Sequence, residues 1–257
     1  ITSSKFGLGE KVLNKVFKNE KKGLIPDTLW KKNNLGKSWV IGETLITGIG
    51  QGYIQTTPLQ LCQMVAQLAN GGFKIYPKII VDENGKTAEE IKILMEENSK
   101  DLIEKKNNLL EVSEQLLNLV NERKYEPLFI DPKNIKLVRE AMFASTNEVR
   151  GTSYSSRIED PKYQFAGKTG TSQVKRITEA ERELDLETSQ IPYNERDHAL
   201  YIAFGPYKNP RYALSIVIEH GGSGSSTAAP IAKKLFKLIV DRHELREKAQ
   251  KKKIVKI

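Results

Sequence analysis

The sequence predicts an α+β fold, in which an antiparallel sheet is flanked by helices in an α/β sandwich. Two runs of strand character, residues 198–204 and 212–218, are joined by a turn-rich connection of hairpin length. A third strand is predicted around Lys168-Thr169-Gly170-Thr171, because apolar and β-prone residues flank it on both sides. Apolar residues at helical spacing surround these strands in the sequence. We therefore expect one sheet with helices on it and the 168–171 strand at its edge.

Composition sets the broad class. The chain has 257 residues, of which 39% are hydrophobic and 28% charged, as in soluble globular proteins, and it can form one large domain or two small ones. No apolar run approaches the roughly 18 residues that a membrane helix needs. The chain begins at Ile1 without a signal-like segment, so we expect it to be part of a longer protein.

The net charge of +9 is compatible with nucleic acid, an anionic membrane or an acidic polymer as a partner. The lysines alternate with glutamates and form no aromatic-studded basic groove, which argues against nucleic-acid binding. The single cysteine, Cys62, excludes an internal disulfide and lies in an apolar helical pattern, where we expect packing. No metal or cofactor is predicted.

The first half of the chain begins with turns and short elements. A Pro26-Asp27 turn precedes Trp30, which we interpret as buried, and an apolar run at 44–52 is interrupted by three glycines. Thr57 and Pro58 then predict a helix start, and the helix continues to about Ala69. Its apolar face consists of Leu61, Met64, Val65 and Leu68, and Asn70-Gly71-Gly72 ends it.

The second half begins with a charged stretch, 82–126, which has helical periodicity with Glu and Lys on the outer faces. We interpret it as an insertion of one or two surface helices, either solvated or a docking surface for a membrane partner. A helix at 135–143 is predicted to end near Asn147, and a last helix to start at about Thr227. The apolar face expected to pack that helix on the sheet is Ile231, Leu235, Leu238 and Ile239.

The Lys-Thr-Gly-Thr strand carries the chemistry. Gly170 inside a strand is costly, so it marks a place where a ligand or another backbone comes close. Lys168, Thr169 and Thr171 offer an ammonium and two hydroxyls, which can hold a carboxylate along an open strand edge.

Several motifs in order carry a resemblance. They are Phe6-Gly-Leu-Gly, Gly23-Leu-Ile-Pro-Asp-Thr-Leu-Trp-Lys, Gly48-Ile-Gly-Gln-Gly followed by Thr57-Pro-Leu-Gln, and Gly167-Lys-Thr-Gly-Thr-Ser-Gln-Val. In these the chain resembles the penicillin-binding protein 2 family, the class B transpeptidases of bacterial cell elongation. The resemblance covers most of the chain, but not the 82–126 insertion or the basic tail at the C-terminus. It implies the penicillin-binding serine transpeptidase (β-lactamase-like) fold, incomplete at the N-terminus, with 1–257 as the C-terminal portion of that domain.

The resemblance also implies a mechanism. In the family a serine attacks the penultimate D-alanyl carbonyl of a peptidoglycan stem peptide, and an amine of a neighbouring stem accepts the acyl group; β-lactams trap the serine. Lys168 would then place positive charge near the substrate carboxylate, and the hydroxyls of Thr169 and Thr171 would hydrogen-bond it. Gly170 would let the substrate lie along the strand, and the N–H of Thr171 would form half of the oxyanion hole.

The nucleophile and its lysine are expected outside this chain, since in the family both the Ser-x-x-Lys and the Ser-x-Asn elements precede the Phe-Gly-Leu-Gly region. Ser145-Thr146-Asn147 matches Ser-x-Asn only in letters, and Ser172-Gln173-Val174-Lys175 lies on a strand, where residues three apart face opposite sides. His198 and His220 are interpreted as structural. The chain as written is expected not to acylate.

Partners and alternatives complete the hypothesis. The resemblance implies stem peptides and β-lactams as ligands, a membrane glycosyltransferase and rod-shape proteins as partners, and a periplasmic domain held at the inner membrane by one N-terminal anchor. The main alternative is a non-catalytic interaction module of the elongation machinery, which fits the absent serine equally well. A serine β-lactamase shares Lys-Thr-Gly, but the Gly-Gln-Gly and Thr-Pro-Leu-Gln motifs argue against it.

Overall fold

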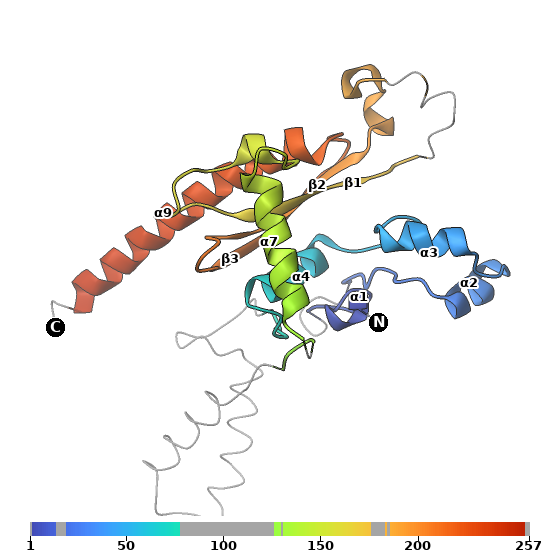
Figure 1. Cartoon of the computed structure of the whole chain (residues 1–257), viewed down its shortest axis with the longest axis horizontal. Coiled ribbons are helices and arrows are strands. Elements are labelled where there is room, and N and C mark those ends of the chain that lie inside the picture. The colour runs from blue at the N-terminus through green and yellow to red at the C-terminus, as the bar shows by residue number, and fades with distance from the viewer. Residues whose placement is uncertain are drawn as a thin grey trace, which may run out of the picture.

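The structure is a computed structural model that describes residues 2–13, 19–77, 126–129, 131–175, 183 and 186–254, with backbone only from 249 onward. The predicted insertion at 82–126 therefore lies outside the described residues except for Glu126. Within the described part, the α+β prediction is confirmed: helices surround one antiparallel sheet of three strands (Figure 1).

The sheet has the order β1-β2-β3, from β1 (Ala166–Ser172), β2 (His198–Gly205) and β3 (Tyr212–Ile218). Gly170 lies opposite Leu200, and Tyr201 opposite Ile216. All three strands lie where the apolar runs predict them. Among the described residues no further strand pairs with β1, so the Lys-Thr-Gly strand is at the edge, as predicted.

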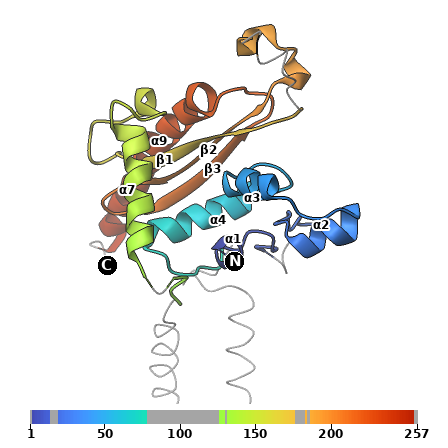
Figure 2. The same ribbon diagram turned by 45° about the vertical axis from the view of Figure 1, so that its right-hand side comes forward.

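Each face of the sheet has its own core, as the alternation of a strand requires. One face packs on α4 (Pro58–Ala69) through residues such as Ala166 and Phe204. The other packs on the long helix α9 (Ala229–Ile254) through Ala199, Tyr201 and Ala203. Figures 1 and 2 show α4 and α9 on opposite sides of the strands, with the C-terminal half of α9 running beyond the sheet.

The inner face predicted for α9 is wrong at Ile231 and Leu238, while Leu235 and Ile239 are half-buried. Leu238 is 63% exposed and Ile231 is 36% exposed, while Ala232, Phe236 and Val240 are buried. The inner stripe is rotated because small alanines let the helix approach the sheet closely, and Phe236 fills the remaining space by stacking on Phe165 at 4.8 Å between ring centroids.

Helix α7 (Lys133–Asn147) crosses the outer edge of β1 and joins both cores. Met142 belongs to the core on the α4 side, while Thr146, one turn later, contacts Tyr201 on the other side. α7 therefore covers the first part of the β1 edge and leaves the rest uncovered.

Helix α4 begins as predicted, with Thr57 accepting a hydrogen bond from the N–H of Gln60 at 3.2 Å. Of its predicted apolar face, Val65 and Leu68 are buried and Leu61 and Met64 are half-buried. Its glutamines are buried as well, which the apolar periodicity did not predict. The side-chain amides of Gln60, Gln63 and Gln67 donate to backbone carbonyls of Glu10 and Lys22, of Ile75, and of Phe6, respectively. These glutamines hold the N-terminal segment, which includes α1 (Thr2–Lys5), against the body of the molecule, by which we mean the sheet with α4, α7 and α9.

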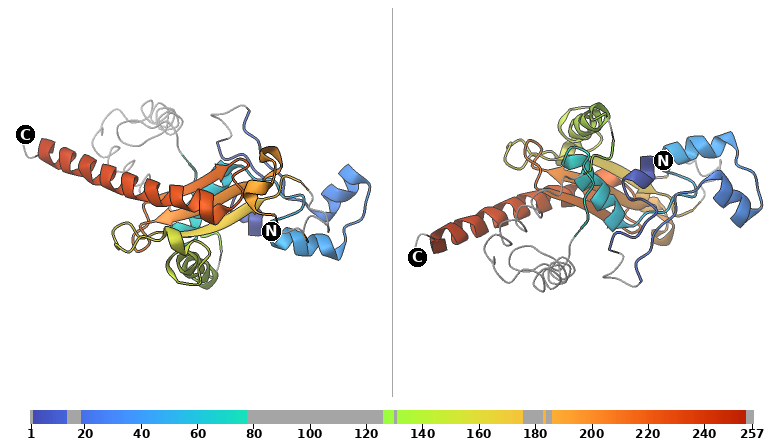
Figure 3. Two further views of the ribbon diagram at one scale, coloured as in Figure 1. Left: turned by 90° about the horizontal axis from the view of Figure 1, so that it is seen from above. Right: turned by 90° about the horizontal axis from the view of Figure 1, so that it is seen from below.

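Helices α2 (Thr28–Leu35) and α3 (Ile41–Gly48) form an arm that projects away from the sheet (Figure 3). Lys31 joins the two helices, since its ammonium lies 2.5 Å from the Glu43 carboxylate and 2.8 Å from the carbonyl of Ser38. No residue of α3 is buried, and Ile41 and Ile49, which caps its end, are 83% and 77% exposed. Trp30, expected to be buried, is half-buried against Tyr53.

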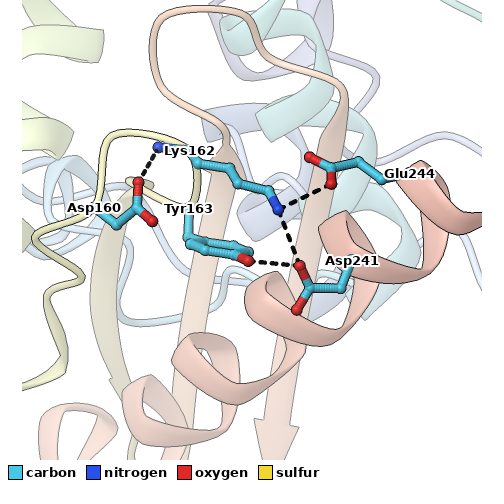
Figure 4. Close-up of polar contacts among 5 residues, drawn as sticks. All are labelled: Asp160, Lys162, Tyr163, Asp241 and Glu244. Atoms are coloured by element: carbon cyan, nitrogen blue, oxygen red, sulfur yellow. Dashed lines mark hydrogen bonds and ion pairs between the residues drawn. The ribbon is translucent and has the colours of Figure 1, made fainter.

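A polar cluster fixes the approach to β1 (Figure 4). The hydroxyl of Tyr163 donates to Asp241 on α9 at 2.5 Å, and the Lys162 ammonium lies 3.2 Å from Asp241 and 3.0 Å from Glu244. The Tyr163 hydroxyl, and then Lys162, lower the pKa of the Asp241 carboxyl. The chain therefore enters β1 from a point attached to α9.

Short helical turns connect these elements: η1 (Tyr154–Ser156), η2 (Thr188–Gln190), η3 (Tyr193–Glu195) and the π-helical η4 (Gly224–Ala228). In the part of the chain that the structure describes, no helix has the length and apolarity to cross a membrane. The same residues contain no group of three or more His, Cys, Asp or Glu side chains placed to hold a metal ion.

Candidate active site

The open part of the β1 edge presents backbone groups in a defined pattern. The N–H of Gly167 points away from β2, since it donates to the hydroxyl of Thr146 at 3.0 Å. In an antiparallel pair the direction of the backbone groups alternates along the strand. Thr169 and Thr171 therefore also turn their N–H and C=O groups outward, past the region that α7 covers.

Two further contacts agree with this direction. The Lys168 ammonium donates to the carbonyl of Thr169 at 2.8 Å, and the side-chain amide of Gln51 donates to the carbonyl of Thr171 at 3.4 Å. The outward carbonyls thus have side-chain donors. Within the described residues, the N–H groups of Thr169 and Thr171 donate no hydrogen bond.

The predicted site residues lie together on this edge. Lys168 and Thr171 are exposed, and Thr169 and Gly170 are half-buried. The hydroxyl of Thr169 lies 3.3 Å from that of Thr152, which lies 3.2 Å from that of Ser145. An ammonium, hydroxyls and outward N–H groups along an unpaired strand can bind an extended peptide and its carboxylate.

A buried cluster of hydroxyls supports the edge from inside. The Tyr201 hydroxyl lies 3.0 Å from the hydroxyls of both Thr146 and Ser153, and all three residues are fully buried. Burial raises the pKa of the Tyr201 hydroxyl, so it stays protonated within this cluster. A Cβ on Gly167 would lie 2.3 Å from the Tyr201 oxygen, and this close approach explains the glycine before Lys168.

The backbone at the start of η4 passes close to Gly170, although a Cβ on Gly170 itself would meet only the Leu200 Cβ, at 3.3 Å. A Cβ on Gly224 would lie 2.7 Å from the Gly170 oxygen and 2.4 Å from the Leu200 oxygen. The start of η4 therefore passes directly over the β1–β2 pair. Only a glycine at 224 allows this approach, and it supports β1 next to Thr171.

The Gly-Gln-Gly motif reaches the same place. Gln51 follows α3 and contacts the carbonyl of Thr171, although 120 residues separate the two in the chain. The structure thus brings together two motifs that the sequence could only list separately.

The segments 145–147 and 172–175, which match Ser-x-Asn and Ser-x-x-Lys in letters, make contacts that stabilise the fold. Asn147 donates to the carbonyl of Phe165 at 2.9 Å, and Thr146 belongs to the buried hydroxyl cluster. Ser172 ends β1, and Lys175 forms a 2.5 Å ion pair with Glu195. Cys62 lies 3.5 Å from the carbonyl of Ala213, and burial raises the pKa of its thiol.

The two histidines lie at the far end of β1 and contact each other. His198 pairs with Ser172 in the ladder, and its Nδ1 accepts a hydrogen bond from the backbone N–H of His220 at 2.9 Å. The sequence did not predict this contact, since nothing in it shows that residues 22 apart face each other across a hairpin.

Comparison with models of known protein families shows to which family this chain belongs. The family model for the penicillin binding protein transpeptidase domain matches residues 2–237. This chain belongs to the penicillin-binding protein transpeptidase family.

The curated relatives described next are similar to this chain over most of its length and share one name. The peptidoglycan D,D-transpeptidase MrdA of Salmonella typhimurium LT2 is 33% identical over 246 residues, which are 93% of this chain and 33% of the relative. MrdA of Escherichia coli K12 is 28% identical over 80% of this chain and 28% of its own length. The chain thus spans about a third of the curated relatives that it matches.

Solved structures show the same fold. Pseudomonas aeruginosa PBP2 in complex with WCK 5153 has a TM-score of 0.64 at 31% identity, with 92% of this chain and 42% of that chain covered. Helicobacter pylori PBP2, solved as a complex with MreC, has a TM-score of 0.64 at 27% identity and covers 94% of this chain and 35% of that one. These comparisons confirm the predicted family, penicillin-binding protein 2, and the predicted fold class.

Proposed function

We propose that this chain is the C-terminal portion of a serine-type D,D-transpeptidase domain, spanning 1–257 with an insertion at 82–126, that cross-links peptidoglycan stem peptides in cell elongation. The observation that carries the proposal is the open β1 edge, where Thr169 and Thr171 turn their backbone groups outward beside Lys168. The membership of the family and the MrdA relatives support it.

On this proposal the residues of β1 bind the peptide, and Thr171 also takes part in catalysis. An extended D-alanyl peptide lies along β1 as an added strand, which the uncovered edge between Lys168 and Ser172 permits. Lys168 and the hydroxyls of Thr169 and Thr171 bind its carboxylate. The N–H of Thr171 stabilises the developing oxyanion, together with the N–H of the nucleophilic serine.

The serine that forms the acyl-enzyme, and the lysine that activates it, come from a Ser-x-x-Lys element upstream of Ile1. This chain alone is then inactive, although it carries the carboxylate-binding strand. β-Lactams, as mimics of the D-Ala-D-Ala end, bind the complete site.

Labelling by a fluorescent penicillin tests the proposal. The 257-residue chain is compared with a protein extended upstream through the next Ser-x-x-Lys. We expect label only on the longer protein, and loss of most of that label in Lys168→Ala. Covalent label on Ser145 or Ser172 of the short chain would refute the assignment of the nucleophile.

A second candidate is a non-catalytic interaction module of the elongation machinery. The exposed apolar residues at either end of α3, Ile41 and Ile49, favour it, since apolar patches of this kind mark contact surfaces. The relative from Helicobacter pylori was solved with MreC, so we propose a rod-shape protein of that kind, and a membrane glycosyltransferase, as partners. If neither protein is labelled while both are folded, this candidate replaces the first.

For the location we propose the periplasm, with the domain held at the inner membrane by a single anchor upstream of Ile1. Fusion of the extended protein to a reporter that is active only outside the cytoplasm tests this. Activity of the reporter is the expected result, and its loss on deletion of the anchor is the control.

A further inference from the structure

Three segments meet at the far end of β1, around His198. The first is the end of β1 itself, since Ser172 pairs with His198 and the N–H of Val174 donates to the Asp197 carboxylate at 3.2 Å. The second is the start of β2. The third is the loop after β3. In this loop the backbone N–H of His220 donates to His198, and that of Gly222 donates to the carbonyl of Asp197.

The hydrogen bonds of the two rings fix their tautomers. His198 Nδ1 accepts from the N–H of His220 at 2.9 Å, so this nitrogen carries no proton. His220 Nδ1 lies 3.1 Å from the carbonyl of Arg196, which can only accept, so this nitrogen is protonated. The rings lie edge to face at 4.9 Å between centroids.

His220 needs a partner to hold its backbone. Its φ of +55° lies in the left-handed region, which is uncommon for a residue with a side chain. The bond to His198 and the bond from Gly222 N–H to Asp197 carbonyl, at 2.8 Å, hold the turn in this conformation.

The turn then determines where η4 lies. One residue, Ser223, separates Gly222 from Gly224, and the backbone at Gly224 passes over Gly170 so closely that a Cβ on Gly224 would lie 2.7 Å from the Gly170 oxygen. Thr227 in η4 donates back to the carbonyl of Gly221 at 2.9 Å. Movement of the turn at His220 is therefore transmitted to the backbone that supports Gly170 and Thr171.

We propose that His198 is a positioning residue for the outward N–H of Thr171: its unprotonated Nδ1 holds the turn at His220, and the turn holds Gly224 against Gly170. The inference rests on the proposed function, in which Thr171 supplies half of the oxyanion hole. His198 itself does not touch the substrate.

Nuclear magnetic resonance of the 15N-labelled chain tests this. Wild type is expected to show a scalar coupling across the hydrogen bond from His220 N–H to His198 Nδ1. His198→Asn places an acceptor oxygen near the position of Nδ1, whereas His198→Leu has a similar volume and no acceptor. His243→Leu, on α9, is the control for loss of a histidine elsewhere.

In His198→Leu we expect amide exchange at His220 and Gly222 to be about fivefold to tenfold faster, as for the loss of one hydrogen bond. The amide resonances of Gly170 and Thr171 should shift. In His198→Asn the exchange rates should stay within about twofold of wild type, and the two resonances should stay in place.

The proposal is overturned if His198→Leu leaves Gly170 and Thr171 unchanged, or if His198→Asn disturbs them as much as His198→Leu does. If His198→Leu does not fold, the wild-type coupling and His198→Asn decide, because absence of the coupling contradicts the hydrogen bond directly. No readout requires a nucleophile or a β-lactam, so failure here is distinguishable from failure of the transpeptidase assignment.

Discussion

At the scale of single residues, the edge of β1 depends on groups that never reach the surface. Tyr201, Thr146 and Ser153 share one buried cluster of hydroxyls, and Thr146 also accepts the N–H of Gly167. A buried polar group that loses its partner keeps the full cost of its desolvation. Small changes in this cluster should therefore cost more than their size suggests.

The substitution Gly167→Ala tests the close approach of Tyr201. The new Cβ would lie 2.3 Å from the Tyr201 oxygen, so the tyrosine has to move and lose its hydroxyl partners. We expect a loss of about 1–3 kcal/mol in the free energy of unfolding, measured by urea denaturation. Gly42→Ala in α3 is the control, because its Cβ meets open space; an equal loss in both variants would contradict the explanation.

The substitution Thr146→Val removes one hydroxyl at nearly constant volume. The N–H of Gly167 and the hydroxyl of Tyr201 then lose a buried partner, and we expect a loss of about 1–3 kcal/mol in the free energy of unfolding. The amide of Gly167 should also exchange faster in hydrogen-exchange measurements. Thr47→Val, on the arm, should change stability by less than about 0.5 kcal/mol. A neutral Thr146→Val would show that the cluster carries no stability.

At the scale of elements, both the arm and the polar cluster that joins Lys162 and Tyr163 to α9 depend on charge. In the arm, Lys31 is 5% exposed and joins α2 to α3 through Glu43, which also accepts the N–H of Val40 at 2.9 Å. On the other side of the molecule, Tyr163 and Lys162 attach the approach to β1 to Asp241 on α9 (Figure 4).

Acid should loosen the arm. The hydrogen bond from Lys31 lowers the pKa of Glu43 below its ordinary 4.5, so the ionised form is favoured in the folded state. Its contribution to stability is present above pH 4.5 and is lost as the pH falls through the lower folded value. Tryptophan fluorescence during acid titration follows this, because Trp30 and Trp39 both lie in the arm.

In Glu43→Gln the acid-dependent change in this fluorescence should disappear, and the arm should already be loosened at neutral pH. Glu148→Gln is the control, since its exposed side chain lies at the end of α7. An unchanged titration in Glu43→Gln would assign the transition to another carboxylate.

The substitution Tyr163→Phe should raise the pKa of Asp241 toward its ordinary 3.8, because the tyrosine hydroxyl is the largest cause of its lowering. Carboxyl 13C shifts measured against pH report this value directly. Tyr76→Phe, in the segment after α4, should leave the Asp241 titration unchanged. If Tyr163→Phe leaves it unchanged too, the neighbouring lysines, Lys162 and Lys237, account for the lowered pKa.

At the scale of the whole molecule, the body and the arm should unfold separately. The sheet shares its two faces between α4 and α9, so both cores depend on the same strands. The arm contributes no buried apolar side chain from α2 or α3 to either core.

Both tryptophans therefore report the arm, whereas far-ultraviolet circular dichroism reports mainly the body. We expect the fluorescence transition at a lower urea concentration than the dichroism transition, as for a locally unfolding unit. Coincident transitions by the two probes would show that arm and body form one cooperative unit.

Sequence patterns predicted the elements well where one periodicity dominates. The three strands, the capped start of α4 and the end of α7 lie at their predicted positions, since each depends on local chemistry. The inner face predicted for α9 was wrong at Ile231 and Leu238 because alanines, which carry little weight in an apolar pattern, decided the packing.

The predicted site residues lie together on the edge, but what supports them could not be predicted. The contacts of Gln51 with Thr171 and of Gly224 with Gly170 join residues far apart in the chain. The buried glutamines of α4 are polar and so were left out of the apolar stripe, although their amides hold the N-terminal segment. Neither the secondary-structure propensities of the residues nor the periodicity of the apolar positions carries information about such long-range contacts.

The uncovered edge of β1 also has a consequence for self-association. An unpaired strand edge invites any extended chain, including the same strand of a second molecule. Here the Lys168 ammonium donates to the carbonyl of Thr169, one of the groups that such a strand would need. An incoming chain must first displace this intramolecular donor, and two copies meeting edge to edge would also bring two ammonium groups together. A ligand that carries a carboxylate gives Lys168 a new partner in exchange. The hydrogen bond from Lys168 to the Thr169 carbonyl therefore favours binding of acidic ligands over pairing with neutral strands.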